Sequence, residues 1–149
     1  MKTILVTGGA GFIGGNFGLD VVGQGGVRVV NLDALTYAGN LDTLAALRGR
    51  DEHVFVRGDI GERARVSALL AEHRPSAIVN FAAESHVDRS IDGPGAFIHP
   101  NVIGTFNLLQ SALDAHTFGT AWGVTTAPAA MAGLGPFVIA EYVPGQRIT

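Results

Sequence analysis

The chain has 149 residues, 47% of them hydrophobic, no cysteine and a formal net charge of −3 at pH 7. This composition is typical of one globular domain and excludes an intrinsically disordered chain, while the weakly acidic balance argues against a nucleic-acid-binding surface. The absence of cysteine excludes disulfides and thiolate chemistry, and because the five histidines are scattered we expect no metal site.

Short β-branched runs alternate with helical stretches along the first 116 residues. Strands are predicted over residues 3–7, 27–32, 53–60 and 76–83. Helices are predicted over residues 12–23, 41–47 and 62–73, and from about residue 94 to residue 115. This fourfold alternation indicates a doubly wound α/β fold of the Rossmann type, in which helices cover both faces of a parallel sheet.

The predicted helices carry apolar side chains at helical spacing. The relevant residues are Phe12, Ile13, Phe17 and Val21 in the first helix, Val66, Leu69 and Leu70 facing inward in the third, and a stripe of Val102, Phe106, Leu109 and Leu113 in the last. Asn40 is placed to cap the second helix. Glycines inside the first helix predict marginal stability, because each costs about 0.5–1 kcal/mol relative to alanine.

Residues 117–149 differ in character from the part before them. They contain three of the six prolines, five glycines and only two charged residues. Residues 121–126 and 137–143 are candidates for a fifth and a sixth strand, but the stretch between them has no helical pattern. We therefore divide the chain into a dinucleotide-binding domain over residues 1–116 and a divergent or truncated tail over residues 117–149, and we expect the fold to be truncated.

The N-terminal stretch MKTILVTGGAG has only a short apolar run before its glycines. It matches neither a signal peptide nor a membrane span, which needs about 20 apolar residues. We therefore expect a cytoplasmic protein with no membrane partner.

The run GGAGFIG, Gly8–Gly14, stands between the first predicted strand and the first predicted helix. It fits the dinucleotide-binding pattern at Gly9, Gly11 and Gly14, and a related pattern that starts at Gly8. Glycines there permit a tight turn, close approach to a pyrophosphate and close packing of helix on strand. The helix N-terminus adds N–H groups that favour phosphate.

Asp33 ends the second predicted strand, about 20 residues after the last glycine of the loop. A carboxylate at this place binds ribose hydroxyls and repels a 2′-phosphate, so the pattern predicts NAD rather than NADP. In the competing interpretation the glycines only make a turn and Asp33 only caps a strand. Asp59 is left open between accepting a hydrogen bond from adenine and capping the helix that follows.

The run FAAESHVDRS follows the fourth predicted strand and brings four ionisable residues into six positions. Glu84 and Ser85 lie just beyond the carboxyl end of that strand, where open α/β sheets bind ligands, and we predict that they belong to the site. His86, Asp88 and Arg89 are better interpreted as solvated residues of the turn that follows.

Several runs together resemble the extended short-chain dehydrogenases, and within them the dTDP-glucose 4,6-dehydratase family. They are VTGGAGFIG, LDALTYAGNL, VFVRGDI, FAAESHVDRSI and NVIGTFNLLQSA, in that order over residues 1–116. The resemblance implies an NAD-dependent lyase of deoxysugar biosynthesis that acts on dTDP-glucose. Its cycle oxidises C4 of the sugar, eliminates water across C5 and C6, and returns the hydride to C6.

The resemblance also implies roles for individual residues. Phe12 and Ile13 match the dinucleotide loop, Asp33 and Thr36 the adenosine ribose, and Asp59 and Ile60 the adenine. The nicotinamide side matches Phe81, Ala82, Ala83, Glu84 and Ser85, with Ser85 also a substrate contact. Ala34 and Pro100 replace a lysine and a threonine of the family, so one cofactor contact is expected to be lost.

The catalytic groups of the family have no counterparts in this sequence. The resemblance leads us to expect a Thr-Asp-Glu run and a Tyr-x-x-x-Lys motif, but Ala127 and Pro128 follow Thr126, and the only lysine is Lys2. We therefore predict no catalytic residue and no substrate domain in this chain. The alternatives are a non-catalytic NAD-binding or interaction module and a nucleotide-sugar epimerase, and a homodimer is possible in each case.

Overall fold

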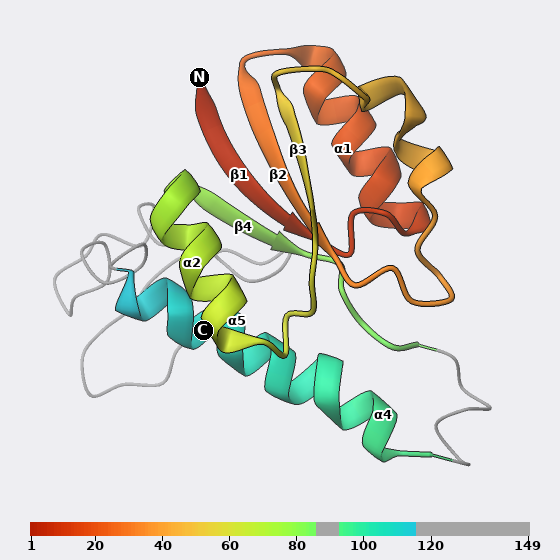
Figure 1. Cartoon of the computed structure of the whole chain (residues 1–149), viewed down its shortest axis with the longest axis vertical. Helices are drawn as coiled ribbons and strands as arrows, with labels where there is room; N and C mark the ends of the chain where they lie inside the picture. The colour runs from red at the N-terminus through yellow and green to blue at the C-terminus, as the bar shows by residue number, and fades with distance from the viewer. Residues whose placement is uncertain (86–92, 116–149) are drawn as a thin grey trace, which may run out of the picture.

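The computed structural model of the chain describes residues 1–85 and 93–115 (Figure 1). Four parallel strands form one sheet in the order β3-β2-β1-β4. They are β1 (Lys2–Thr7), β2 (Val27–Asp33), β3 (His53–Arg57) and β4 (Ala77–Asn80). The strands β1 and β2 lie within one residue of their predicted bounds, whereas β3 and β4 end three residues earlier than predicted, where the chain turns into the loops of the carboxyl edge.

The helices cover both faces of the sheet. They are α1 (Phe12–Gln24), the 3₁₀-helix η1 (Leu41–Leu47), α2 (Arg63–His73), and a continuous rod of α4 (Gly95–Ile98), the π-helix η2 (His99–Gly104) and α5 (Thr105–Asp114). Figure 1 shows α1 on one side of the sheet and α2 with the rod on the other. None of the helices in these described ranges is long and apolar enough to cross a membrane.

Two apolar cores, one on each face, hold the layers together. On the α1 side Val6, Val22 and Val29 pack with Leu44 and Leu47 of η1. On the opposite side the core is formed by strand residues together with α2 and α5, namely Leu5, Val30, Leu32, Ile60, Val66, Leu69, Leu70 and Leu108. The predicted doubly wound α/β fold is confirmed, as are the inward positions in α2.

The first helix packs on the sheet through small residues rather than through its large apolar ones. Its buried positions are Gly14, Gly15, Gly18 and Val22. Phe12 and Ile13, at the start of the helix, are 84% and 67% exposed, so their helical spacing does not place them in the core. The physical reason is distance: a β-carbon at Gly15 would lie 2.5 Å from Cγ2 of Thr43, so only glycine allows η1 to approach so closely.

The stripe predicted on the last helix exists, but it does not face the core. Val102, Phe106, Leu109 and Leu113 are between 42% and 57% exposed. The face that packs against α2 and the loop before it combines Leu108 with smaller or polar residues, namely Gly104, Asn107, Ser111 and Ala112. Their size lets the helices approach closely enough for Ser67 Oγ to donate a hydrogen bond to Ser111 Oγ at 3.2 Å.

Asn40 caps η1 as predicted, since its side chain accepts a hydrogen bond from the Asp42 N–H. His86, Asp88 and Arg89 lie outside the described residues, as do the candidate strands over residues 121–126 and 137–143. The division of the chain at residue 116 remains a prediction.

Replacing Gly23 by alanine should stabilise the fold. Gly23 is exposed near the end of α1, and nothing lies within 4 Å of a β-carbon built there, so Gly23→Ala gains helix propensity without a clash. We expect the free energy of unfolding in urea to rise by about 0.5 kcal/mol. The matched change Gly15→Ala should lower it, because Thr43 and η1 must move. Equal effects of the two changes would contradict this packing.

Acid should weaken the fold through His53. Burial lowers the pKa of the His53 imidazole, and its Nε2 has no hydrogen-bond partner among the described residues. As the pH falls, the unfolded chain therefore binds this proton before the folded chain does. Protonation of His53 costs no stability above about pH 6.5, and the free energy of unfolding decreases as the pH falls through the folded pKa. In His53→Leu the free energy of unfolding should fall less steeply between pH 7 and pH 5. Identical slopes would contradict the assignment, and both proteins should be insensitive to this group above pH 7.

Candidate functional site

The glycine loop starts where β1 ends, in the space between the carboxyl ends of β2 and β4. The Gly8 N–H donates to the Leu32 carbonyl at 2.9 Å, and the Phe81 N–H donates to the Thr7 carbonyl at 2.9 Å. Gly8 has a φ of +68°, and a β-carbon there would lie 2.5 Å from the backbone nitrogen of Ala82. Position 8 therefore requires glycine for two reasons, the left-handed backbone and the close approach of the segment after β4.

Gly14 brings the start of α1 down onto this loop. A β-carbon at Gly14 would lie 2.4 Å from the Gly8 carbonyl oxygen, which also accepts the Gly11 N–H at 3.2 Å. The N-cap residue Gly11 has no side chain, so no side-chain hydrogen bond occupies the first turn of α1. Its N–H groups point out of the helix start, as an anion-binding helix terminus requires.

Asp33 fastens the loop to the end of β2. One carboxylate oxygen accepts the Ala10 N–H at 2.8 Å and the other accepts the Leu35 N–H at 2.8 Å, and the residue is 7% exposed. Each oxygen keeps a second lone pair, so these bonds leave acceptor capacity toward a ligand. The sequence predicted a carboxylate at this place but not that it would hold the glycine loop itself.

Asp59 also makes a local turn. Its Oδ1 accepts the Gly61 N–H at 2.7 Å, and its carbonyl accepts the Glu62 N–H at 3.0 Å. The N-cap of α2 is Glu62, so of the two roles left open for Asp59 the structure does not place it at the cap.

The segment after β4 runs across the glycine loop. Oγ1 of Thr7 donates a hydrogen bond to Oδ1 of Asn80, which also accepts the Ala82 N–H at 3.2 Å. The Phe81 ring packs against Phe17 of α1 at a centroid distance of 5.4 Å. These contacts fix Phe81 and Ala82 beside the loop, so that the following residues Ala83 and Glu84 project along the carboxyl edge.

A cleft of about 340 Å³ opens at this edge. Of the predicted site residues it is lined by Gly8, Gly11, Asp33, Thr36, Asp59, Ile60, Phe81, Ala82, Ala83 and Glu84. Phe12, Ile13, Gly14 and Ser85 do not line it. Phe12, Ile13 and Ser85 are exposed near its rim, and Gly14 is buried beneath the loop.

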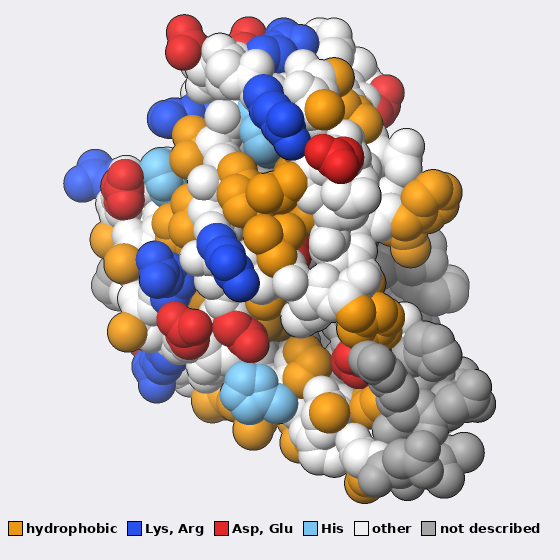
Figure 2. All heavy atoms as spheres, turned by 45° about the vertical axis from the view of Figure 1, so that its right-hand side comes forward, with side chains coloured by type: hydrophobic (Ala, Val, Ile, Leu, Met, Phe, Trp, Pro, Cys, Tyr) orange, Lys and Arg blue, Asp and Glu red, His pale blue; other side chains and the backbone are white. Residues whose placement is uncertain are grey.

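The cleft is acidic. Asp33, Asp59 and Glu84 contribute carboxylates, and its described lining contains no lysine or arginine. A dianionic 2′-phosphate beside Asp33 would therefore meet like charge without a compensating cation, whereas ribose hydroxyls would meet acceptors. Figure 2 shows one face of the molecule, on which the basic side chains lie among acidic and apolar ones.

The sequence missed several residues that position the walls of the cleft. Asn107 donates from Nδ2 to the carbonyl of Gly61 at 2.8 Å, and Asn101 hydrogen-bonds to the backbone of Glu84. The His99 ring lies so close to Gly61 that a β-carbon there would be 2.2 Å from it. All three come from the rod. Their only sequence signal is a polar residue within an apolar helix.

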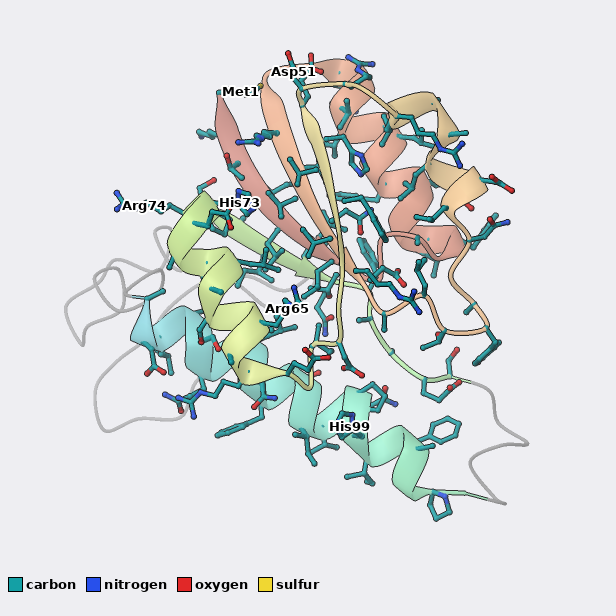
Figure 3. The ribbon with its side chains drawn as sticks, viewed as in Figure 1. Met1, Asp51, Arg65, His73, Arg74 and His99 are labelled. Atoms are coloured by element: carbon teal, nitrogen blue, oxygen red, sulfur yellow. The ribbon has the colours of Figure 1, made fainter. Side chains whose placement is uncertain are left out.

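The single lysine lies at the opposite edge of the sheet. Lys2 begins β1, whose carboxyl end leads into the glycine loop. In Figure 3, Met1 and Asp51 mark this amino edge, while His99 lies beyond the other end of the sheet. Within residues 1–85 and 93–115, no three metal-ligating side chains come together to hold a metal ion.

Comparison with known proteins identifies relatives over this same part of the chain. A family model described as GDP-mannose 4,6 dehydratase matches residues 5–121. A dTDP-glucose 4,6-dehydratase from Xanthomonas campestris pv. campestris (strain B100) is 68% identical over 114 residues, which are 76% of this chain and 32% of that protein. The chain thus spans about a third of the length of the curated relatives it matches.

Solved structures of dehydratases and epimerases also match about three quarters of this chain. A dTDP-glucose 4,6-dehydratase from Streptomyces venezuelae with NAD bound is 45% identical, with a TM-score of 0.73 over 77% of this chain and 37% of that one. A UDP-glucose-4-epimerase from Stenotrophomonas maltophila with NAD bound is 33% identical, with a TM-score of 0.70 over 78% of this chain and 34% of that one.

Replacing Asp33 by asparagine should loosen the glycine loop. An amide offers one acceptor oxygen in place of two, so either the Ala10 or the Leu35 N–H faces an NH₂ group and loses its partner. We expect the free energy of unfolding to fall by about 1–3 kcal/mol. The control Asp42→Asn changes an 83% exposed side chain that pairs with Arg48, and it should alter stability by less than about 0.5 kcal/mol. A neutral Asp33→Asn would contradict the role of this carboxylate.

Proposed function

We propose that this chain, which belongs to the dTDP-glucose 4,6-dehydratase family of NAD-dependent epimerases and dehydratases, is the NAD-binding portion of an enzyme acting on a nucleotide sugar. The observation that carries the proposal is the acidic cleft at the carboxyl edge, where the glycine loop, Asp33 and the segment after β4 meet. Relatives whose structures contain NAD share this part of the fold.

The residues present fit the parts of a dinucleotide. The start of α1, with Gly11 and the backbone of Phe12 and Ile13, supplies N–H groups for the pyrophosphate. Asp33 and Thr36 serve the adenosine ribose. Asp59 and Ile60 serve the adenine, and Phe81 to Ser85 the nicotinamide side.

The cofactor, when bound, supplies a hydride acceptor for the sugar and later the hydride donor. Toward that chemistry this chain contributes binding and orientation. Glu84 lies in the lining of the cleft, and Ser85 lies exposed beside it, where we assign it a contact with the substrate. No catalytic residue is assigned, because the only lysine lies at the amino edge and cannot assist a tyrosine near the cleft.

The substrate we propose is dTDP-glucose, the sugar in the names of the two relatives that are 68% and 67% identical. The cleft alone does not separate a dehydratase from an epimerase, because epimerases share this part of the fold. The run AAESHVDRSI, with the Glu84-Ser85 pair, favours the dehydratase. A non-catalytic NAD-binding or interaction module, a homodimer and a cytoplasmic location remain predictions.

Isothermal titration calorimetry of residues 1–149 tests the cofactor site. We expect NAD⁺ to bind and NADP⁺ to bind at least tenfold more weakly, because the 2′-phosphate meets Asp33. Gly14→Ala should abolish binding, since it displaces the start of α1 from the Gly8 carbonyl. Well-folded protein that binds neither dinucleotide would overturn the site assignment.

The same protein should form no 4-keto sugar from dTDP-glucose and NAD⁺. Product detected by mass spectrometry would show that catalytic groups exist where the sequence places none. A stoichiometric protein complex without NAD binding would instead favour the interaction module.

A further inference from the structure

One side-chain hydrogen bond joins the two walls of the cleft. The Tyr37 hydroxyl donates to Oε1 of Glu84 at 2.5 Å, across 47 positions of sequence. Tyr37 belongs to the loop between β2 and η1, and its neighbours Thr36 and Ala38 line the cleft on that side. Glu84 lines it on the side of β4. The bond therefore spans the mouth between two segments that Figure 1 shows as separate loops at the carboxyl edge.

Asn101 holds the Glu84 end of this bond from a third element. Its Oδ1 accepts the Glu84 N–H at 2.8 Å, and its Nδ2 donates to the Glu84 carbonyl at 2.8 Å. A side-chain amide that pairs with both backbone groups of one residue fixes the position and the rotation of that residue. Asn101 lies in η2, the π-helical turn of the rod, and π-helical turns are frequent at functional sites.

We propose that Tyr37, Glu84 and Asn101 form a bridge over the cofactor cleft that retards release of the dinucleotide, with Asn101 as its positioning residue. The proposal rests on the proposed function of the cleft as the NAD site. The Tyr37–Glu84 bond connects the two walls between which the dinucleotide would lie, so opening of this bond should ease its release. Asn101 keeps that bond populated by holding the Glu84 backbone in register with the opposite wall.

Retention of the cofactor suits an enzyme that removes a hydride from its substrate and returns it within one cycle. Release between the two steps would strand the oxidised sugar intermediate. In this proposal the glycine loop and Asp33 contact the dinucleotide on the floor of the cleft, whereas the bridge slows the exchange of the dinucleotide with solvent. The bridge should therefore affect the dissociation rate constant more than the association rate constant.

The test measures NADH release from residues 1–149 by stopped-flow fluorescence, with excess NAD⁺ as the chase. We expect Tyr37→Phe and Glu84→Ala to release NADH about three- to tenfold faster than the unaltered chain, the size of one intramolecular hydrogen bond. The control Gln110→Ala removes a bond to Asp114 on the same rod, away from the cleft, and should change nothing.

Asn101→Ala should also speed release, and the double variant with Tyr37→Phe should release NADH no faster than the quicker single variant. Such non-additivity is expected if Asn101 acts only through the bridge. Additive effects would overturn its role as the positioning residue. If Asn101→Ala fails to fold by circular dichroism, Tyr37→Phe decides, because its phenol is on an exposed side chain.

An unchanged release rate in Tyr37→Phe overturns the bridge while leaving the cofactor site intact. An unaltered chain that binds no NADH overturns the proposed function instead.

Discussion

Three backbone segments meet at Gly8, and the site depends on how closely they approach there. The loop after β1 binds the end of β2 through the Gly8 N–H, carries the start of α1 against the Gly8 carbonyl, and lies against the backbone of Ala82. A side chain at this position would separate the segment after β4 from the loop. The cleft exists because its floor is made of backbone, which leaves N–H groups and space where side chains would otherwise stand.

The rod of α4, η2 and α5, which lies on the α2 side of the sheet, sets the width of that cleft. Asn107 donates a hydrogen bond to the carbonyl of Gly61, in the loop before α2. Asn101 pairs with both backbone groups of Glu84, in the segment after β4. A single rigid element thus positions two loops that leave different strands. Precise placement of loop residues by a helix explains how a site built largely on turns can keep a fixed geometry.

The proposed cofactor cleft and the single lysine lie at opposite edges of the sheet. The carboxyl edge carries the carboxylates of Asp33, Asp59 and Glu84, whereas Lys2 begins β1 at the amino edge. In a parallel sheet the two edges are separated by the full length of the strands, so no local rearrangement brings Lys2 to the cleft. The family relationship therefore supports cofactor binding here more directly than it supports turnover.

The sequence by itself determined the alternation of strands and helices, the glycine loop and the carboxylate at the end of β2. These features are local, because a strand, a turn and a helix start each follow from the spacing of neighbouring residues. Only the tertiary structure decided that α1 packs through glycines, that the Val102 and Phe106 stripe is exposed, and that Asp33 hydrogen-bonds to the glycine loop. It also joined Tyr37, Glu84 and Asn101. Helical periodicity shows that two faces differ, but which face is buried depends on how closely a neighbouring element can approach, and contacts between residues far apart in sequence leave no local pattern.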